Sequence, residues 1–269
     1  MQPPGSEAAA VNRLKVMLVQ AQLLWKDPAH NREHLENLLA SAGADCHLAV
    51  LPETFTTGFL GDADLPEEGM DGPTVAWMTA VAARRRYALA GSAVIVERGQ
   101  RFNRLLFVTP DGTVRHYDKR HLFAYGGEHH RYTAGTRRVN VDYLGWRINL
   151  QVCYDLRFPA WCRYRGDYDL MLLVANWPTR RAAHWSLLLE ARAVENQCWV
   201  VGVNRVGQDG NGLQYPGRSV VHDPMGERVA DLGGAEGCRV AELDLDRVAR
   251  VRNEFPFQAD ADRFTLLDA

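Results

Sequence analysis

Residues 149–159 read NLQVCYDLRFP, and this stretch predicts how the chain is built around one reactive position. A strand that runs to Val152 leads directly into Cys153, and a turn containing Pro159 and a helix with tryptophan and arginine follow. A side chain at such a strand exit is presented at the edge of a sheet, where the next backbone N–H can point toward a reacting carbonyl group. The stretch therefore predicts a strand–turn–helix unit that presents Cys153 as a nucleophile. A buried structural cysteine is the alternative, because that is the commoner fate of a cysteine in a strand.

Strand and helix patterns alternate on both sides of this unit, as apolar runs and helical stripes follow one another. Strands are expected at 14–23, 48–51, 88–97, 170–175, 198–206 and 239–245. Helices are expected from Pro28, after the N-cap residue Asp27, to the stop at Gly43, from Pro73 onward, at 182–197 and after the last strand. Hairpins are expected over 104–119, over 139–152 and around Pro224 to Gly226.

This order of elements favours an α/β layered fold that contains both parallel and antiparallel strand pairs. No linker, low-complexity tract or repeat divides the sequence. We therefore expect a single domain over residues 1–269, with a core at about 13–255 and a C-terminal tail at 256–269.

Composition excludes several classes of partner and cofactor. Of the 269 residues, 46% are hydrophobic and 24% are charged, and the formal net charge of −2 removes the electrostatic argument for a nucleic-acid or membrane partner. The first twelve residues lack the apolar run of a secretory signal, and the five cysteines are scattered without a Cys-x-x-Cys pair. His121, His129 and His130 lack the companions that a zinc site needs. We expect a cytoplasmic protein with no cofactor and no metal.

Two further polar residues follow predicted strands. Glu53 follows the apolar run at 48–51, and Lys119 ends the hairpin at 104–119. Taken alone, each has a simple alternative, a solvated loop glutamate and an exposed hairpin lysine. Together with Cys153 they supply what thiol-dependent amide hydrolysis requires. A cation favours the thiolate and faces the oxyanion, and a carboxylate carries the proton to the departing nitrogen.

Five motifs occur in an order that resembles the nitrilase superfamily of carbon–nitrogen hydrolases, from Val16 to about Glu254. They are LPETFTTGF, YDKRHLF, CYDLRFP, ANWP, and ARAVENQ running into VVGVNRVG. The second and third, together with NRVGQDGNG, are most similar to the bacterial omega-amidase branch. The resemblance implies a four-layer α-β-β-α sandwich with mixed sheets, assembled as a homodimer. It also implies a small-molecule amide substrate, the ω-monoamide of a short dicarboxylic acid such as 2-oxoglutaramate or succinamate.

The resemblance implies a role for each matching residue. Cys153 would be the nucleophile, Glu53 the general base and later acid, and Lys119 the oxyanion stabiliser, assisted by the backbone N–H of Tyr154. Glu128 would position the substrate or hold Lys119, and a surface loop acid is the alternative for this residue.

Substrate contacts and rival functions rest on fewer residues. Arg157 is expected to bind the distal carboxylate, with an ion pair to a neighbour such as Asp155 as the alternative. Trp177 is expected to form an apolar wall, with core packing as the alternative. The sequence departs from the family at Arg218, where an acidic residue is common, so the resemblance does not predict the packing or pocket contacts near this residue. The rival functions are a nitrilase, an N-carbamoyl amidase, an acyl transferase, a catalytically silent ligand-binding relative, and a redox-sensing thiol protein in which Cys162 would be the partner.

Overall fold

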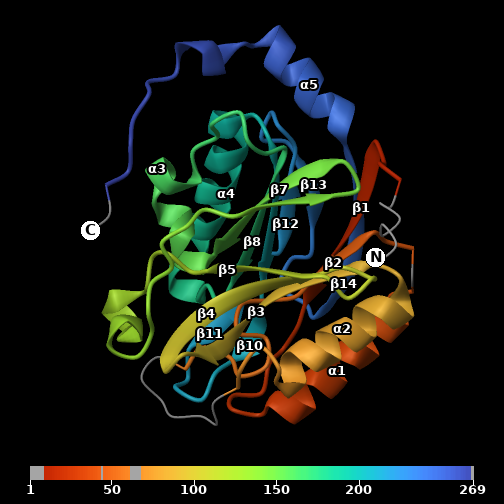
Figure 1. Cartoon of the computed structure of the whole chain (residues 1–269), viewed down its shortest axis with the longest axis vertical. Coiled ribbons are helices and arrows are strands. Elements are labelled where there is room, and N and C mark those ends of the chain that lie inside the picture. The colour runs from red at the N-terminus through yellow and green to blue at the C-terminus, as the bar shows by residue number, and fades with distance from the viewer. Residues whose placement is uncertain (1–8, 44, 61–67, 268–269) are drawn as a thin grey trace, which may run out of the picture.

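The structure, a computed structural model, describes residues 9–43, 45–60 and 68–267 and has two six-stranded sheets that pack face to face (Figure 1). The first sheet contains, in spatial order, β14 (Gly237–Asp244), β1 (Arg13–Gln20), β2 (Leu48–Val50), β3 (Ala88–Glu97), β4 (Gln100–Val108) and β5 (Val114–Asp118). The second contains β13 (Arg228–Asp231), β12 (Val220–His222), β9 (Trp199–Asn204), β8 (Leu170–Ala175), β7 (Trp146–Val152) and β6 (Asn140–Tyr143). Both sheets are mixed, with parallel pairs at their centres and antiparallel pairs toward their edges.

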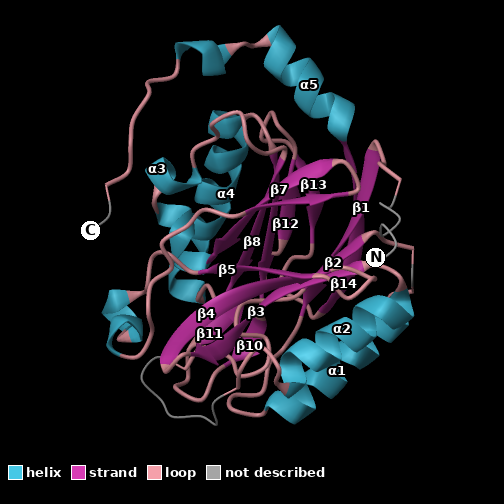
Figure 2. Ribbon diagram, viewed as in Figure 1, coloured by secondary structure: helices cyan, strands magenta, loops and turns pink. Residues whose placement is uncertain are grey.

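Helices cover the outer face of each sheet (Figure 2). The α-helices are α1 (Pro28–Ser41), α2 (Pro73–Arg85), α3 (Pro159–Cys162), α4 (Ala182–Asn196) and α5 (Leu245–Glu254). The short 3₁₀ helices are η1 (Ala124–Gly126), η2 (Glu128–His130), η3 (Cys153–Arg157), η4 (Thr179–Arg181) and η5 (Phe257–Asp260). With α1 and α2 on one side and α4 on the other, the layers follow the order α-β-β-α. The four-layer sandwich with mixed sheets that the sequence predicts is confirmed.

Burial on both faces explains why the central strands have nearly continuous apolar sequences. In β1, Leu14, Val16 and Leu18 belong to the core between the two sheets. Met17 and Val19 alternate with them and belong to the core beneath α1 and α2. A third core lies between the second sheet and α4. The side chains of each central strand alternate between two cores. A shift of register by one residue would therefore move every side chain of that strand into the wrong layer.

Local signals fix where the helices begin and end. The Asp27 side chain accepts a hydrogen bond from the backbone N–H of His30, and Pro28 occupies the first turn of α1. The residue that ends α2, Arg86, has a left-handed backbone with φ of 62°. The amphipathic helix α4 buries Trp185 and Leu189 against the second sheet. Both helix starts that the sequence predicts at prolines are therefore confirmed.

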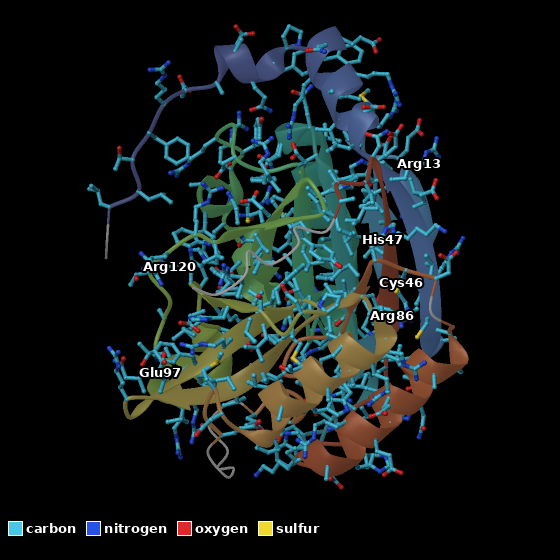
Figure 3. The ribbon with its side chains drawn as sticks, turned by 45° about the vertical axis from the view of Figure 1, so that its right-hand side comes forward. Arg13, Cys46, His47, Arg86, Glu97 and Arg120 are labelled. Atoms are coloured by element: carbon cyan, nitrogen blue, oxygen red, sulfur yellow. The ribbon has the colours of Figure 1, made fainter. Side chains whose placement is uncertain are left out.

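Many charged side chains lie on the outside, as Figure 3 shows for Arg13 and Glu97. Arg13 pairs with Glu242 across the β1–β14 ladder at 2.6 Å, and both side chains are largely in solvent. Such exposed pairs contribute little to stability because water and salt screen them. The three apolar cores are therefore the main source of stability in this fold.

Most predicted elements are confirmed, and four are corrected. The strand predicted at 14–23 begins at Arg13 and ends at Gln20. The first strand of the hairpin at 104–119 begins earlier, at Gln100. The strand predicted at 198–206 ends at Asn204, whose side-chain amide donates to the carbonyls of Trp177 and Gly217. The chain continues into a separate two-stranded ribbon of β10 (Val206–Gln208) and β11 (Gln214–Pro216), which the sequence did not indicate. The helix predicted after Cys153 is a 3₁₀ helix followed by a single α-helical turn.

The unusual residue Arg218 contributes to the fold through its backbone. Its side chain is exposed, and its φ of 58° is in the left-handed region. Its N–H donates to the Gly233 carbonyl at 2.7 Å, and its own carbonyl accepts from Trp185 Nε1 at 2.8 Å. The substitution of a cation for the usual acid is therefore accommodated at the surface.

The sheets bring the ends of four strands together at one edge of the sandwich. Glu53 follows β2 by three residues, Lys119 directly follows β5, Cys153 directly follows β7 and Asn176 directly follows β8. Ends of parallel strands are the usual position for binding sites in α/β proteins. Among the described residues, no helix is both long and apolar enough to cross a membrane.

Candidate active site

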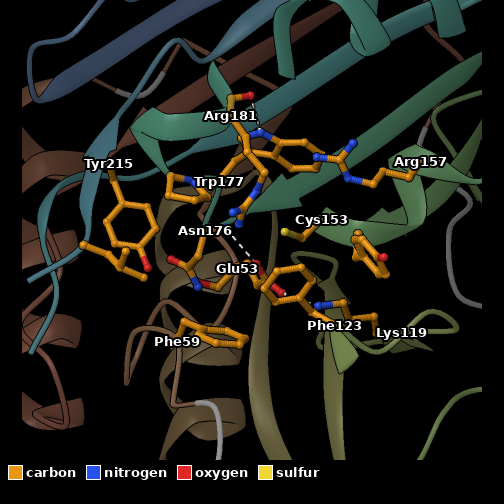
Figure 4. Close-up of a pocket in the computed structure, with 13 residues that line it drawn as sticks. Glu53, Phe59, Lys119, Phe123, Cys153, Arg157, Asn176, Trp177, Arg181 and Tyr215 are labelled. Carbon is orange, nitrogen blue, oxygen red and sulfur yellow. Dashed lines mark hydrogen bonds and ion pairs between the residues drawn. The ribbon is translucent and has the colours of Figure 1, made fainter. Parts of the chain in front are cut away.

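A cavity lies where these strand ends meet (Figure 4). Glu53, Lys119 and Cys153 all line it, although they are separated by up to a hundred residues in sequence. Small-molecule sites are typically concave and mainly apolar, with a few polar groups that converge on the bound molecule. The two sheets therefore deliver an acid, an ammonium group and a thiol to a space that suits a small ligand.

Lys119 lies between two buried carboxylates. Its Nζ is 2.9 Å from Glu53 Oε1, and it is 2.9 Å and 3.2 Å from Glu128 Oε2 and Oε1. The side chains of these three residues are at most 1% exposed. Buried charges require such pairing, because an isolated ion loses its hydration without compensation. The position of Glu128 excludes the surface loop acid as an interpretation of this residue.

Neutral hydrogen-bond donors orient both carboxylates. Asn103 Nδ2 donates to Glu53 Oε1 at 2.8 Å and to Glu128 Oε1 at 3.1 Å. The Asn176 backbone N–H donates to Glu53 Oε2 at 2.7 Å, and the Phe123 N–H donates to Glu128 Oε2 at 2.6 Å. Each glutamate is thus held by groups from several elements, which fixes its oxygens relative to the cavity.

Cys153 lies on a tight turn with a strained backbone. Its φ of 45° is in the left-handed region, which costs about 1–3 kcal/mol for a residue with a side chain. The carboxylate of Asp155 holds this turn, because it accepts hydrogen bonds from Val152 N–H at 3.0 Å and Tyr117 Oη at 2.8 Å. It also accepts from the backbone N–H of His121 at 3.0 Å. Asp155 therefore connects the cysteine turn to the segment on both sides of Lys119.

The backbone N–H of Tyr154 lies at the start of η3, and Tyr154 lines the cavity. The first N–H groups of a helix have no carbonyl partner within that helix. The Lys119 ammonium also faces this cavity. The site thus offers two kinds of donor, a cation and a backbone amide, near the Cys153 sulfur.

The electrostatics of the site favour a neutral thiol and a charged ammonium. Burial raises the pKa of Cys153 well above its ordinary value, and the Glu53 carboxylate raises this pKa further, although the Lys119 ammonium opposes both. Burial alone would lower the pKa of Lys119, but the carboxylates of Glu128 and Glu53 outweigh burial and raise it. At neutral pH the thiol therefore keeps its proton until a base removes it.

Comparison with known proteins identifies this arrangement. The sequence profile of the carbon–nitrogen hydrolase family matches residues 15–253. The chain belongs to the carbon–nitrogen hydrolase family. It is 46% identical to "Omega-amidase YafV" of Yersinia enterocolitica, over 96% of this chain and 100% of that protein. It is 31% identical to "2-oxoglutaramate amidase" of Bacillus subtilis, over 90% and 95% of the two chains.

A solved structure supports the same assignment. XC1258 from Xanthomonas campestris is described as a CN-hydrolase superfamily protein with an arsenic adduct in its active site. It is 46% identical to this chain and superposes with a TM-score of 0.92, over 95% of this chain and 100% of that chain. The resemblance to the nitrilase superfamily that the sequence motifs indicate is therefore confirmed.

The rest of the carbon–nitrogen hydrolase cavity is mainly apolar, with two arginines. The apolar and aromatic lining consists of Phe59, Phe123, Trp177, Pro178, Leu213 and Tyr215. Trp177 is 2% exposed, so it serves both as a wall of the cavity and as part of the core beneath α4. Arg157 stacks on the Trp177 ring at 4.7 Å and does not bond to Asp155, whose oxygens bind the partners described above.

Several residues at the site were missed in the sequence, and four of them have polar groups that matter to its chemistry. Asn103 is a polar residue within a largely apolar strand, and this placement is the signal that could have indicated it. The structure shows that its side chain is buried. Asn176 is part of the ANWP motif, but nothing local predicts that its backbone N–H faces Glu53. Arg181 and Tyr215 line the cavity from η4 and β11, whose positions depend on the tertiary fold.

Glu53→Gln is expected to lower the pKa of Cys153, so that its sulfur reacts at lower pH. The substitution removes a negative charge that raises the pKa of Cys153 and leaves the Lys119 ammonium, which lowers it. The pH profile of Cys153 alkylation by iodoacetamide should therefore move to lower pH, because the thiolate is the reacting form. Glu254→Gln, at the exposed end of α5, is the control and should keep the wild-type profile. A profile for Glu53→Gln that stays in place or moves to higher pH would contradict this electrostatic coupling.

Proposed function

We propose that this carbon–nitrogen hydrolase cleaves the ω-amide of a small dicarboxylic acid monoamide, of the 2-oxoglutaramate or succinamate type, to the acid and ammonia. The observation that carries the proposal is the cavity that Glu53, Lys119 and Cys153 share. The choice of substrate class is supported by 46–47% identity to omega-amidases over nearly the whole chain. A cytoplasmic location is part of the proposal, supported by five cysteines that are all free.

In the first half of the reaction, Cys153 Sγ attacks the amide carbon while Glu53 accepts the thiol proton. The proton transfer must accompany the attack, because the pKa of the buried thiol is raised. The C=O bond becomes an oxyanion, which the Lys119 ammonium and the Tyr154 N–H stabilise. When the tetrahedral intermediate collapses, Glu53 gives the proton to the nitrogen and the C–N bond breaks. Ammonia leaves, and the acyl group remains on Cys153 as a thioester.

In the second half, water replaces ammonia. Glu53, now a carboxylate again, accepts a proton from the water molecule as its oxygen attacks the thioester carbon. The second tetrahedral intermediate uses the same two oxyanion donors. Its collapse breaks the C–S bond, the proton returns to Sγ, and the carboxylic acid is released. Covalent catalysis thus divides one difficult hydrolysis into two easier steps.

Glu128 has a supporting role in this scheme. Its two oxygens accept from Lys119, which holds the ammonium toward the cavity and keeps it protonated. Arg157 and Trp177 are proposed to contact the substrate on the side away from the amide. An indole provides an apolar wall for a short carbon chain, and a guanidinium attracts a carboxylate.

The substrate class is tested by ammonia release from a panel of compounds. Succinamate and 2-oxoglutaramate should be hydrolysed far faster than a nitrile or an N-carbamoyl amino acid. Cys153→Ala should reduce the rate by at least about a thousandfold, because the covalent step is lost. Cys46→Ala, a buried cysteine away from the cavity, is the matched control and should retain activity. Full activity in Cys153→Ala would refute the thioester route, and a preference for another compound would change the substrate class.

A homodimer is the second part of the proposal. Leu187 and Val194 on α4 are 66% and 50% exposed, and Met225, in the β12–β13 turn, is 43% exposed. A side chain added at Gly226 in that turn would touch Val194, so the turn and α4 form one apolar patch. Apolar patches of this kind are common at subunit interfaces. A second copy of the chain is the partner that fits the proposed symmetric assembly.

Light scattering after size-exclusion chromatography tests the dimer. The wild-type chain should elute with twice the mass of one chain, and Leu187→Glu should shift it to the monomer, because a buried unpaired charge opposes association. Leu24→Glu, at an exposed leucine elsewhere on the surface, should remain dimeric. A wild-type monomer, or a dimer unaffected by Leu187→Glu, would refute this interface.

A further inference from the structure

Arg181 is a cation in the cavity that has no protein counter-ion among the described residues. It is the last residue of η4, and its guanidinium lies 5.1 Å from the centre of the Phe123 ring. Trp177 Nε1 donates to its backbone carbonyl at 2.7 Å, which holds the end of η4 against the cavity wall. Figure 4 shows the Arg181 side chain extending into the cavity toward Cys153.

The other two cations of the described cavity lining have protein partners. Lys119 is surrounded by the carboxylates of Glu53 and Glu128. Arg157 is stacked on the indole of Trp177, and its Nη2 lies 3.2 Å from His184 Nδ1. Arg181 is therefore the cation whose hydrogen-bonding groups are most available to a bound molecule.

The surroundings of Arg181 favour an anion. Partial burial lowers the pKa of Arg181, and although the nearby Cys153 opposes this, the positive charge of Arg157 lowers the pKa further. A guanidinium stays protonated even so, and it has lost hydration without gaining a counter-ion. A carboxylate would restore both, because it matches the two parallel N–H donors of a guanidinium.

The direction from which Arg181 enters the cavity also fits the substrate class. Cys153 marks where the amide carbon must lie, and Lys119 marks the direction of the carbonyl oxygen. Arg181 approaches from the opposite side of the cavity, with the Phe123 and Trp177 rings beside the intervening space (Figure 4). Two apolar rings suit the methylene groups that separate an ω-amide from a carboxylate.

We propose that Arg181 is the specificity-determining residue that binds the distal carboxylate of the substrate, while Arg157 lies beside it and supports the positive field. This inference rests on the proposed function, and it names the group that selects ω-monoamide acids over neutral amides. Because Arg181 contacts the end of the substrate away from the reacting atoms, its loss should weaken binding of charged substrates and leave the chemistry on neutral amides intact.

The test compares Arg181→Gln with Arg180→Gln, a matched control at the exposed neighbouring arginine of the same 3₁₀ helix. The substrates are succinamate and butanamide, in which a methyl group replaces the carboxylate. Arg181→Gln should lower kcat/KM for succinamate by about 100-fold, mostly through KM, as expected for a lost hydrogen-bonded charge pair. Its kcat/KM for butanamide should stay within about threefold of wild type. Arg180→Gln should match wild type for both substrates, and Arg181→Lys should fall between, because it keeps the charge and loses the two-point contact.

A second measurement does not depend on amidase activity. Succinate should slow the alkylation of Cys153 by iodoacetamide in wild type and in Arg180→Gln, and it should give no protection in Arg181→Gln. Thermal unfolding midpoints near the wild-type value would show that the variants fold.

Equal losses for both substrates, no loss for succinamate, or equal protection by succinate in Arg181→Gln would overturn the role of Arg181. If wild type releases no ammonia from succinamate but succinate still protects Cys153 through Arg181, the proposed substrate fails and the carboxylate site stands.

Discussion

The site depends on one buried ammonium shared by two carboxylates. Lys119 is held by Glu53 and Glu128 in a region almost free of solvent. Removing one member of such a cluster leaves an uncompensated charge, which costs about 3–5 kcal/mol. Two acids and one base leave the cluster with one negative charge in total, and this charge lies beside the Cys153 thiol. The thiol is therefore kept protonated until the substrate arrives, and the same carboxylate that raises its pKa accepts its proton.

The two sheets hold that cluster beside the strained turn at Cys153. Cys153 and Thr54, the residue after Glu53, both have left-handed backbones, with φ of 45° and 40°. Thr54 N–H is fixed by the hydroxyl of Ser92 at 2.8 Å, and Asp155 holds the cysteine turn. Strain of this kind persists only where surrounding contacts over-determine the backbone. The three apolar cores provide that rigidity, since both faces of each central strand are packed.

The sequence predicts much of the framework because the central strands are buried on both faces. The bounds of β3 and β8 agree with the predicted 88–97 and 170–175, since continuous apolar runs leave few alternatives. The β10–β11 ribbon could not be predicted, because its strands are three residues long and partly exposed. Short strands of that kind are stabilised by tertiary contacts and not by their own pattern.

The residues of the site also divide into those that the sequence could predict and those that it could not. Glu53, Lys119 and Cys153 stand at strand ends and carry recognisable motifs, so the sequence could suggest them. Asn103 and Arg181 are different, because their importance comes from which neighbours the fold supplies. Asn103 bridges two carboxylates from separate loops, and Arg181 lacks a counter-ion among the described residues. Neither a bridge between loops nor a missing ion pair has a signature in local sequence.

Mass spectrometry of acid-quenched enzyme tests the central claim most directly. During turnover of succinamate, the peptide that contains Cys153 should carry the acyl group of the substrate as a thioester, and the adduct should disappear when the substrate is exhausted. An acyl group on any other residue, or ammonia release that continues undiminished after Cys153 has been fully alkylated, would contradict covalent attack from this cavity.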